Sequence, residues 1–179
     1  MISTAALKLG GFALAHAANI VSDLTPPNLL VPFALCEDQA GAKTLNIFEA
    51  ATQEQAVARG KAFMASLPGA FQRCAFARDG IWRGQDGSGM DALTVTFWER
   101  GQESELTISQ RYKSPGRSAF GLIGEAIVIE DGNVLEGVAA ESVTRGFLAG
   151  VADYPDGQAR WRRWGGQPAL PTSSRGDSI

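Results

Sequence analysis

Between residues 91 and 113 the chain alternates between apolar and polar side chains in two consecutive stretches. The apolar members of both stretches fall on one side of an extended chain: Leu93, Val95, Phe97, Leu106 and Ile108. Period-two alternation rich in β-branched and aromatic residues predicts half-buried strands. If one strand shifted by one residue relative to the other, its polar and charged side chains would be buried and its apolar ones exposed. The pattern therefore also predicts how the two strands pair. We therefore expect two antiparallel strands joined by a turn at residues 100–102.

A third apolar run covers residues 120–129 and is apolar on both faces, which is typical of a central strand. Glu125 is the exception within it. Burial would raise the pKa of this carboxyl and suit it to general acid chemistry, so Glu125 is the one weak catalytic candidate. Pairing with Arg111 or Lys113 is the commoner outcome for a buried glutamate, and an exposed position on the sheet is the alternative.

The remaining patterns complete an α+β domain. We expect an N-terminal helix, a hairpin, a helix, strands, a third helix and a C-terminal arm with a flexible tail, at residues 3–23, 28–48, 52–67, 71–135, 137–151 and 158–179. Asp79-Gly80 has the composition of a hairpin turn. The fold class is a mainly antiparallel sheet of about six strands with helices packed on one face, in a single domain over residues 1–157.

Composition excludes little and favours no enzyme class. The chain has 179 residues, a formal net charge of −3 and one histidine. The mild acidity gives no strong case for nucleic acid or membrane. Its two cysteines, Cys36 and Cys74, lack metal-ligand spacing; two buried thiols or a disulfide both remain open.

The N-terminal segment allows two interpretations. We expect a retained helix and a cytoplasmic protein. The alternative is a secretory signal over residues 1–17, with Lys8 as its charged start, which would make the protein secreted or periplasmic.

No residue pattern predicts a metal site, a cofactor or a catalytic motif. His16 falls on an alanine-rich helix face, where a lone histidine is more often a packing residue than a base. With one histidine, a histidine metal site is disfavoured, and a serine or cysteine triad would need His16.

Two surfaces could bind another protein. On the polar side of the strands, Trp98 is accompanied by Thr96, Ser109 and Arg111. The arm carries Trp161, Arg162, Arg163 and Trp164. Aromatic residues and arginine are enriched in protein interfaces. We therefore expect a non-catalytic binding module, such as a small bacterial adaptor, inhibitor or immunity-type protein, with another protein as its partner. Its oligomeric state stays open.

Two alternatives remain. One is a small-molecule binder or enzyme with a pocket at the junction of sheet and helices, where Glu125 would act with Arg111 or Tyr112. The other is an arm at residues 158–164 that binds a membrane or nucleic acid, since arginine with interleaved tryptophan can stack on bases or bind phosphate.

Overall fold

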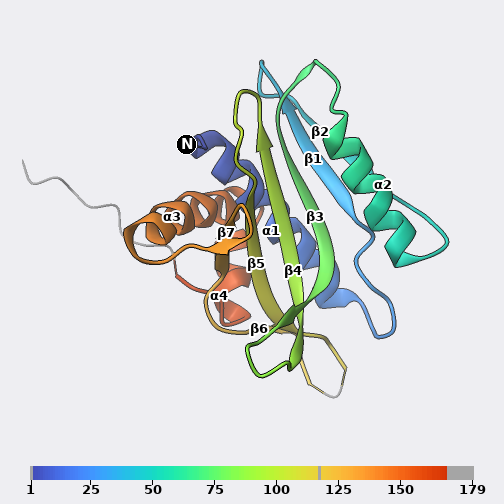
Figure 1. The fold of residues 1–179 in the computed structure, drawn as a ribbon. Helices are drawn as coiled ribbons and strands as arrows, with labels where there is room; N and C mark the ends of the chain where they lie inside the picture. Colours follow the sequence, from blue (N-terminus) through green and yellow to red (C-terminus); the bar gives the residue numbers. More distant parts are fainter. Residues whose placement is uncertain (1, 117, 169–179) are drawn as a thin grey trace, which may run out of the picture.

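The computed structural model describes residues 2–116 and 118–168. Figure 1 shows one antiparallel sheet with helices on both of its faces. The sheet has eight strands: β1 (Phe33–Asp38), β2 (Lys43–Ile47), β3 (Phe71–Arg83), β4 (Gly89–Glu99), β5 (Leu106–Lys113), β6 (Gly121–Leu122), β7 (Ile127–Glu130) and β8 (Asn133–Val134). Their order is β2-β1-β3-β4-β5-β7-β8, with β6 also paired to β5. The predicted α+β class is confirmed, with somewhat more strands than the six expected and with helices on both faces of the sheet rather than on one.

The alternating stretches form the centre of this sheet. β4 and β5 pair antiparallel with Val95 opposite Ile108, the register that the hydrophobic pattern predicts. The apolar side chains of both strands are buried in one core.

Two helices cover this core. α1 (Thr4–Asp23) begins after Ser3, whose side chain accepts a hydrogen bond from Ala6 N, and it packs along α3 (Gly137–Asp153). The two helices lie so close that a Cβ on Gly11 would sit 1.8 Å from the Phe147 carbonyl oxygen. Glycine is therefore required at this crossing, since it brings the two backbones into contact.

The third long helix lies on the opposite face of the sheet (Figure 1). α2 (Gln53–Ala65) begins after Thr52, whose hydroxyl accepts a hydrogen bond from Gln55 N at 3.2 Å. It covers a small cluster of four buried residues: Ala34, Cys36, Cys74 and Phe76. A Cβ on Gly60 would sit 2.1 Å from the Phe76 ring, so this glycine allows the helix to approach the sheet.

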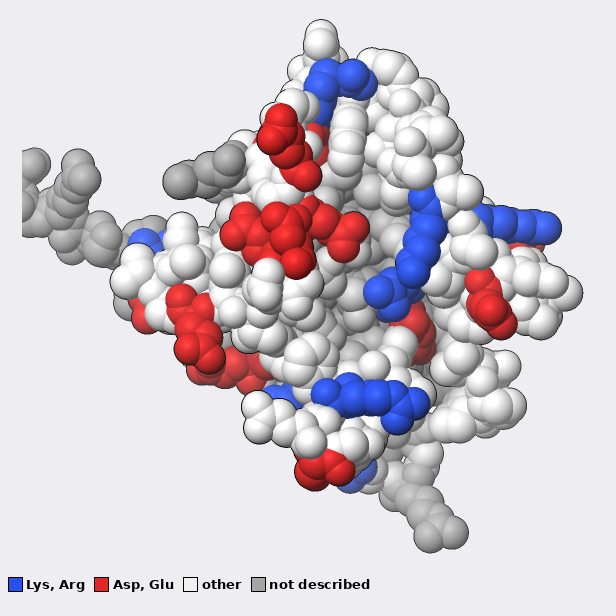
Figure 2. All heavy atoms as spheres, viewed as in Figure 1, with Lys and Arg blue, Asp and Glu red and all other residues white. Residues whose placement is uncertain are grey.

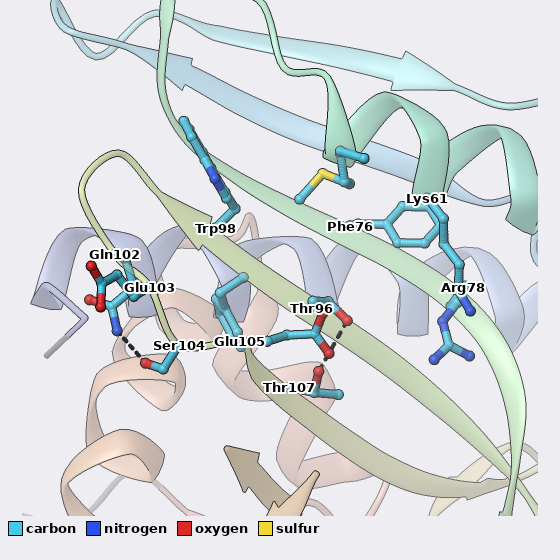
Figure 3. A pocket seen from close by; sticks show the side chains of 13 residues that line it. Lys61, Phe76, Arg78, Thr96, Trp98, Gln102, Glu103, Ser104, Glu105 and Thr107 are labelled. Carbon is cyan, nitrogen blue, oxygen red and sulfur yellow. Dashed lines mark hydrogen bonds between the residues drawn. The ribbon is translucent and has the colours of Figure 1, made fainter. Parts of the chain in front are cut away.

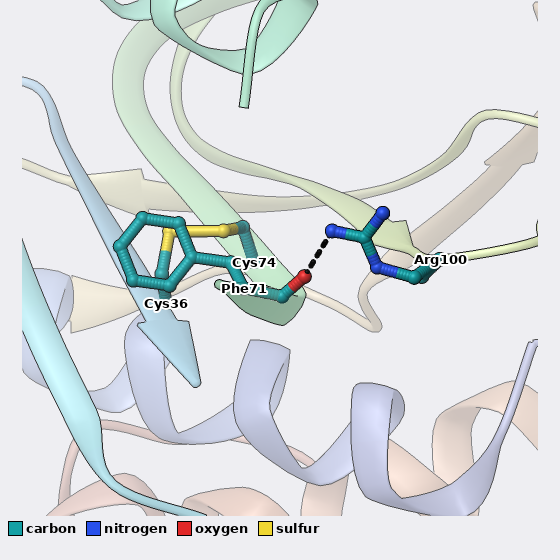
Figure 4. The surroundings of a disulfide bond; sticks show 4 residues. All are labelled: Cys36, Phe71, Cys74 and Arg100. Carbon is teal, nitrogen blue, oxygen red and sulfur yellow. Dashed lines mark hydrogen bonds between the residues drawn. A yellow bond between two sulfur atoms is a disulfide. The ribbon is translucent and has the colours of Figure 1, made fainter. Parts of the chain in front are cut away.

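Cys36 and Cys74 lie opposite each other on β1 and β3 and form a disulfide. Figure 4 shows that Phe71 lies across the bridge, while Arg100 donates a hydrogen bond to the Phe71 carbonyl oxygen. The pairing was left open by the sequence because it depends on the register between two strands that are far apart in the chain.

The Asp79-Gly80 pair does not turn the chain. β3 continues through both residues, and the Asp79 carboxylate is buried, where it accepts hydrogen bonds from Tyr112 Oη at 2.8 and 2.9 Å. The main-chain nitrogens of Leu30 and Gly80 donate to it as well. Burial raises the pKa of Asp79, although the hydrogen bond from Tyr112 opposes that change.

The run at residues 120–129 is two short strands rather than one. Residues 123–126 lie between β6 and β7 opposite only Gln110 and Arg111 of β5, so two extra residues bulge out. Gly124 has φ +64°, a conformation that favours glycine. Glu125 is at the bulge and is exposed, so the expectation of a buried glutamate was wrong.

The C-terminal arm continues as α4 (Gly157–Arg163), which packs against α3. Trp161 is buried in the α1-side core, and Trp164 stacks edge-on against Phe120 with ring centroids 5.1 Å apart. The predicted flexible tail from residue 169 lies outside the described residues.

α1 is long and apolar enough to span a membrane by length and composition, with a mean hydropathy of 1.2. Of the window that meets this test, 61% is buried inside the domain. Core helices of soluble proteins and signal sequences meet the same test, so the helix alone does not decide between the two interpretations of this segment.

Candidate functional site

A groove of about 580 Å³ lies where α2 stops covering the sheet. Its floor is the polar side of β3, β4 and β5, and one rim is the hairpin between β4 and β5 (Figure 3). It combines apolar, hydroxyl and charged side chains, including Met64, Phe76, Trp98, Thr96, Thr107, Lys61, Arg78, Glu103 and Glu105. Such a mixture is typical of a binding surface rather than of a packed core.

Trp98 forms the aromatic part of the groove. Its ring is half-buried at the margin of the α2-side cluster, and the Arg100 guanidinium lies 5.6 Å from its centroid. Arg100 in turn donates hydrogen bonds to the carbonyl oxygens of Gly69 and Phe71 at 3.0 and 2.7 Å. The tryptophan is therefore held in place beside a cation whose own position is fixed by the backbone.

Charges of opposite sign lie on the two sides of the groove. Lys61 and Arg78 lie toward α2, whereas Glu103 lies toward the β4–β5 hairpin (Figure 3). Figure 2 shows an acidic cluster near the centre of this face with basic side chains to its right, and charges of both signs elsewhere on the face. A ligand that crosses the groove would meet both signs of charge.

Arg78 is the most unusual group in the groove. Burial lowers the pKa of its guanidinium, an effect that the charge of Glu105 partly opposes. Within the part of the chain that the structure describes, the Arg78 side chain makes no hydrogen bond or ion pair. On the same strand Arg73 bonds to Glu37 at 2.7 Å and lies 3.5 Å from Glu99. Half-buried arginines are normally paired in this way, so Arg78 has capacity for an additional acceptor.

The predicted contact residues of the sheet divide into two groups. Thr96 and Trp98 line the groove, and the Thr96 hydroxyl lies 3.1 Å from that of Thr107. Ser109 is only 3% exposed, because its short side chain lies between Thr94 on β4 and Ile127 on β7. Ser109 is therefore not part of the exposed contact surface that the sequence pattern predicted.

Arg111 and Glu125 line a second, more open hollow of about 900 Å³ between β7 and the start of α3. The Nε of Arg111 is buried and has no hydrogen-bond partner among the described residues. Glu125 and Arg111 thus line the same open hollow, but no ion pair joins them among the described residues.

The arm presents arginines and few aromatic atoms. Trp161 is 2% exposed and Trp164 packs on Phe120, so neither ring offers its full surface to a partner. Arg160 bonds to the Asn19 side chain, while Arg162 and Arg163 are exposed.

His16 is half-buried on α1. Its Nδ1 lies 3.2 Å from Tyr154 Oη, and its ring stacks edge-on against Phe33. Burial lowers the pKa of the imidazole, which favours the neutral form. These contacts fit the packing role that the sequence predicted. Across residues 2–116 and 118–168, no group of three or more His, Cys, Asp or Glu side chains is placed to hold a metal ion.

The sequence did not identify Lys61, Arg78, Glu103 and Glu105 as groove residues. Arg78 carried one usable signal, since it follows Phe76 by two positions and so shares its face of the strand. Lys61 had none, because its place depends on where α2 crosses the sheet.

Comparisons of this chain with protein-family models, with curated proteins and with solved structures gave no match, so the groove's geometry and chemistry stand alone as the guide to function.

Proposed function

We propose that this chain is a non-catalytic protein-binding module that holds a segment of another protein in the groove between α2 and the β4–β5 hairpin. The observation that carries the proposal is Arg78, a half-buried cation with no acceptor in the described part of the chain. Its guanidinium lines an open groove with donor groups that no described side chain uses, which favours a role in binding.

The composition of the groove supports a protein segment as the ligand. Trp98 and Phe76 are aromatic residues that line the groove, and Lys61 lies with Arg78 on the α2 side. A partner with an acidic group near Arg78 and a basic group near Glu103 would match both sides. The central anchors would be Arg78 and Trp98, the residue types that most often dominate protein interfaces.

The test is capture of partners from an extract of the native source with the full chain as bait. Arg78→Glu reverses the charge inside the groove, and we expect it to lose a stoichiometric partner that the wild type retains. Arg83→Glu makes the same change at the exposed end of the same strand and should retain it. A partner that survives Arg78→Glu but is lost when the exposed Arg162 and Arg163 are both changed to Glu would move the site to the arm.

A second candidate is a small-molecule binder that uses the hollow beside α3. It is favoured by the buried, unpartnered Nε of Arg111 in the same wall as Glu125, within the described residues. Mass spectrometry of the intact protein, purified under native conditions, would show a bound compound that Arg111→Gln loses. If neither protein carries a compound, this second candidate is ruled out for that source.

A further inference from the structure

The two edges of the sheet differ in how well they are protected. β8 is two residues long and leads directly into α3, so it offers almost no free backbone. β2 at the other edge is five residues long, and Lys43, Thr44, Leu45 and Ile47 are all exposed. Natural sheets usually shorten, charge or cover such an edge, because unpaired N–H and C=O groups attract another strand.

The backbone groups that face outward on β2 follow from its pairing with β1. Phe48 N donates to Pro32 O at 2.9 Å, so by antiparallel alternation the even-numbered residues of this strand bond to β1. The odd-numbered residues, Lys43, Leu45 and Ile47, therefore turn their N–H and C=O groups away from the sheet.

These same residues carry exposed apolar side chains. Leu45 is 44% exposed and Ile47 is 58% exposed, and both point to the α1 side of the sheet. Lys43 precedes them and Glu49 follows them at alternate positions, and both are exposed. Lys43 lies 3.8 Å from Glu37 of β1 in a partly exposed ion pair, and Glu49 lies two residues past the end of β2. The edge thus carries a positive, two apolar and a negative side chain at alternate positions.

We propose that β2 pairs with β2 of a second copy of this chain, antiparallel about a twofold axis at Asn46. In this register Leu45 lies opposite Ile47 of the second copy, and Lys43 lies opposite its Glu49. Because the positive charge precedes the apolar pair and the negative charge follows it, two antiparallel copies of this strand place opposite charges face to face. This argues for a second copy rather than an unrelated strand. The outward backbone groups of each copy then complete a ladder across the axis.

The register predicts a specific cross-link. Asn46 faces Asn46 of the second copy as a non-hydrogen-bonded pair, where the Cα atoms lie about 4.5 Å apart, within disulfide reach. Asn46→Cys should form a covalent dimer under mild oxidation. Thr44→Cys, two residues along the same strand, has no matching thiol and should stay monomeric on a denaturing gel without reductant. The native cysteines are buried and bridged, so they do not compete.

Sedimentation of the uncrosslinked protein tests the interface independently. The wild type should sediment as a dimer, and Ile47→Lys should raise its dissociation constant by about tenfold or more. Val134→Lys, at the 53% exposed position on the opposite edge, should leave it unchanged. Lys43→Glu and Glu49→Lys should each weaken the dimer, and the two changes together should restore it. A wild type that is monomeric at every concentration, or cross-linking by Thr44→Cys instead of Asn46→Cys, would overturn the proposal.

Discussion

On the face of the sheet that α1 and α3 cover, side chains from both helices and most strands form one continuous core. On the α2 face the buried cluster among the described residues consists of Ala34, Cys36, Cys74 and Phe76. The first face has a backbone contact between its two helices at Gly11, whereas the second has few fully buried apolar residues and a disulfide. Beyond α2 this second face opens into the groove with Arg78. The comparison indicates that the α1 and α3 face is stabilised by a large core, whereas the α2 face relies on a small cluster and a disulfide and leaves part of its surface open.

Removing the disulfide should have the largest effect, and it should fall on the α2 face. The bridge closes a loop with a sequence separation of 38 residues, for which chain entropy gives about 4 kcal/mol of stabilisation. We expect Cys36→Ala/Cys74→Ala to lower the free energy of unfolding in urea by that order. Reductant should lower the free energy of unfolding of the wild type and leave that of the double variant unchanged. A loss below about 1 kcal/mol would mean that the small cluster is sufficient without the bridge.

Substitution of the crossing glycine should come next and tests the other face. Gly11→Ala places a Cβ against the Phe147 carbonyl, which cannot move without its helix, so we expect a loss of about 3 kcal/mol. Gly60→Ala on α2 meets the side-chain rings of Phe76 and Phe48 rather than a backbone and should cost less, since side chains can move aside. Gly69→Ala meets nothing within 4 Å and serves as the control. Equal losses at Gly11 and Gly60 would contradict the difference between the faces.

Asp79 is a buried acidic residue on the largely apolar α1 side of the sheet, and it should make the stability of the domain depend on pH. Because burial raises the pKa of Asp79 above its ordinary value of 3.8, the folded state holds this proton more tightly than the unfolded chain. Its stabilising contribution is complete below pH 3.8 and is lost as the pH rises through the folded pKa. The free energy of unfolding of the wild type should therefore fall, relative to Asp79→Asn, as the pH rises across that range. The slope should approach about 1.4 kcal/mol per pH unit between the unfolded and folded pKa values. Parallel pH profiles of the two proteins would contradict this.

The smallest effect on stability should come from the groove. Arg78 has no partner among the described residues, so Arg78→Gln should change the free energy of unfolding by no more than about 0.5 kcal/mol. Arg73→Gln on the same strand breaks the pairs with Glu37 and Glu99 and should cost more. If Arg78→Gln destabilised the domain as much as Arg73→Gln, the guanidinium would be structural.

The strands were predictable wherever local alternation determined them. The pairing of β4 with β5 followed from the buried side of Val95 and Ile108, because a slip by one residue would have exposed both. Asp79-Gly80 shows the limit of local signals. Its turn composition was overridden by a tertiary partner, Tyr112, which lies 33 positions away in the chain.

The candidate site was less predictable than the fold. Trp98 and Thr96 were identified from the polar side of a strand, and both line the groove. Ser109 shared their side but is covered, since side-chain length and neighbouring strands decide what reaches the surface. The role of Glu125 depended on a bulge of two residues that apolar periodicity does not reveal.

The most direct test of the central claim is site-specific photo-cross-linking in the native source. A photoreactive residue replaces Lys61, which is exposed at the rim of the groove, and in a matched protein it replaces Lys113, exposed on β5 away from the groove. The account predicts one discrete protein adduct from position 61 that Arg78→Glu abolishes, and none from position 113. Adducts of the same protein from both positions, or an adduct at 61 that persists with Arg78→Glu, would contradict it.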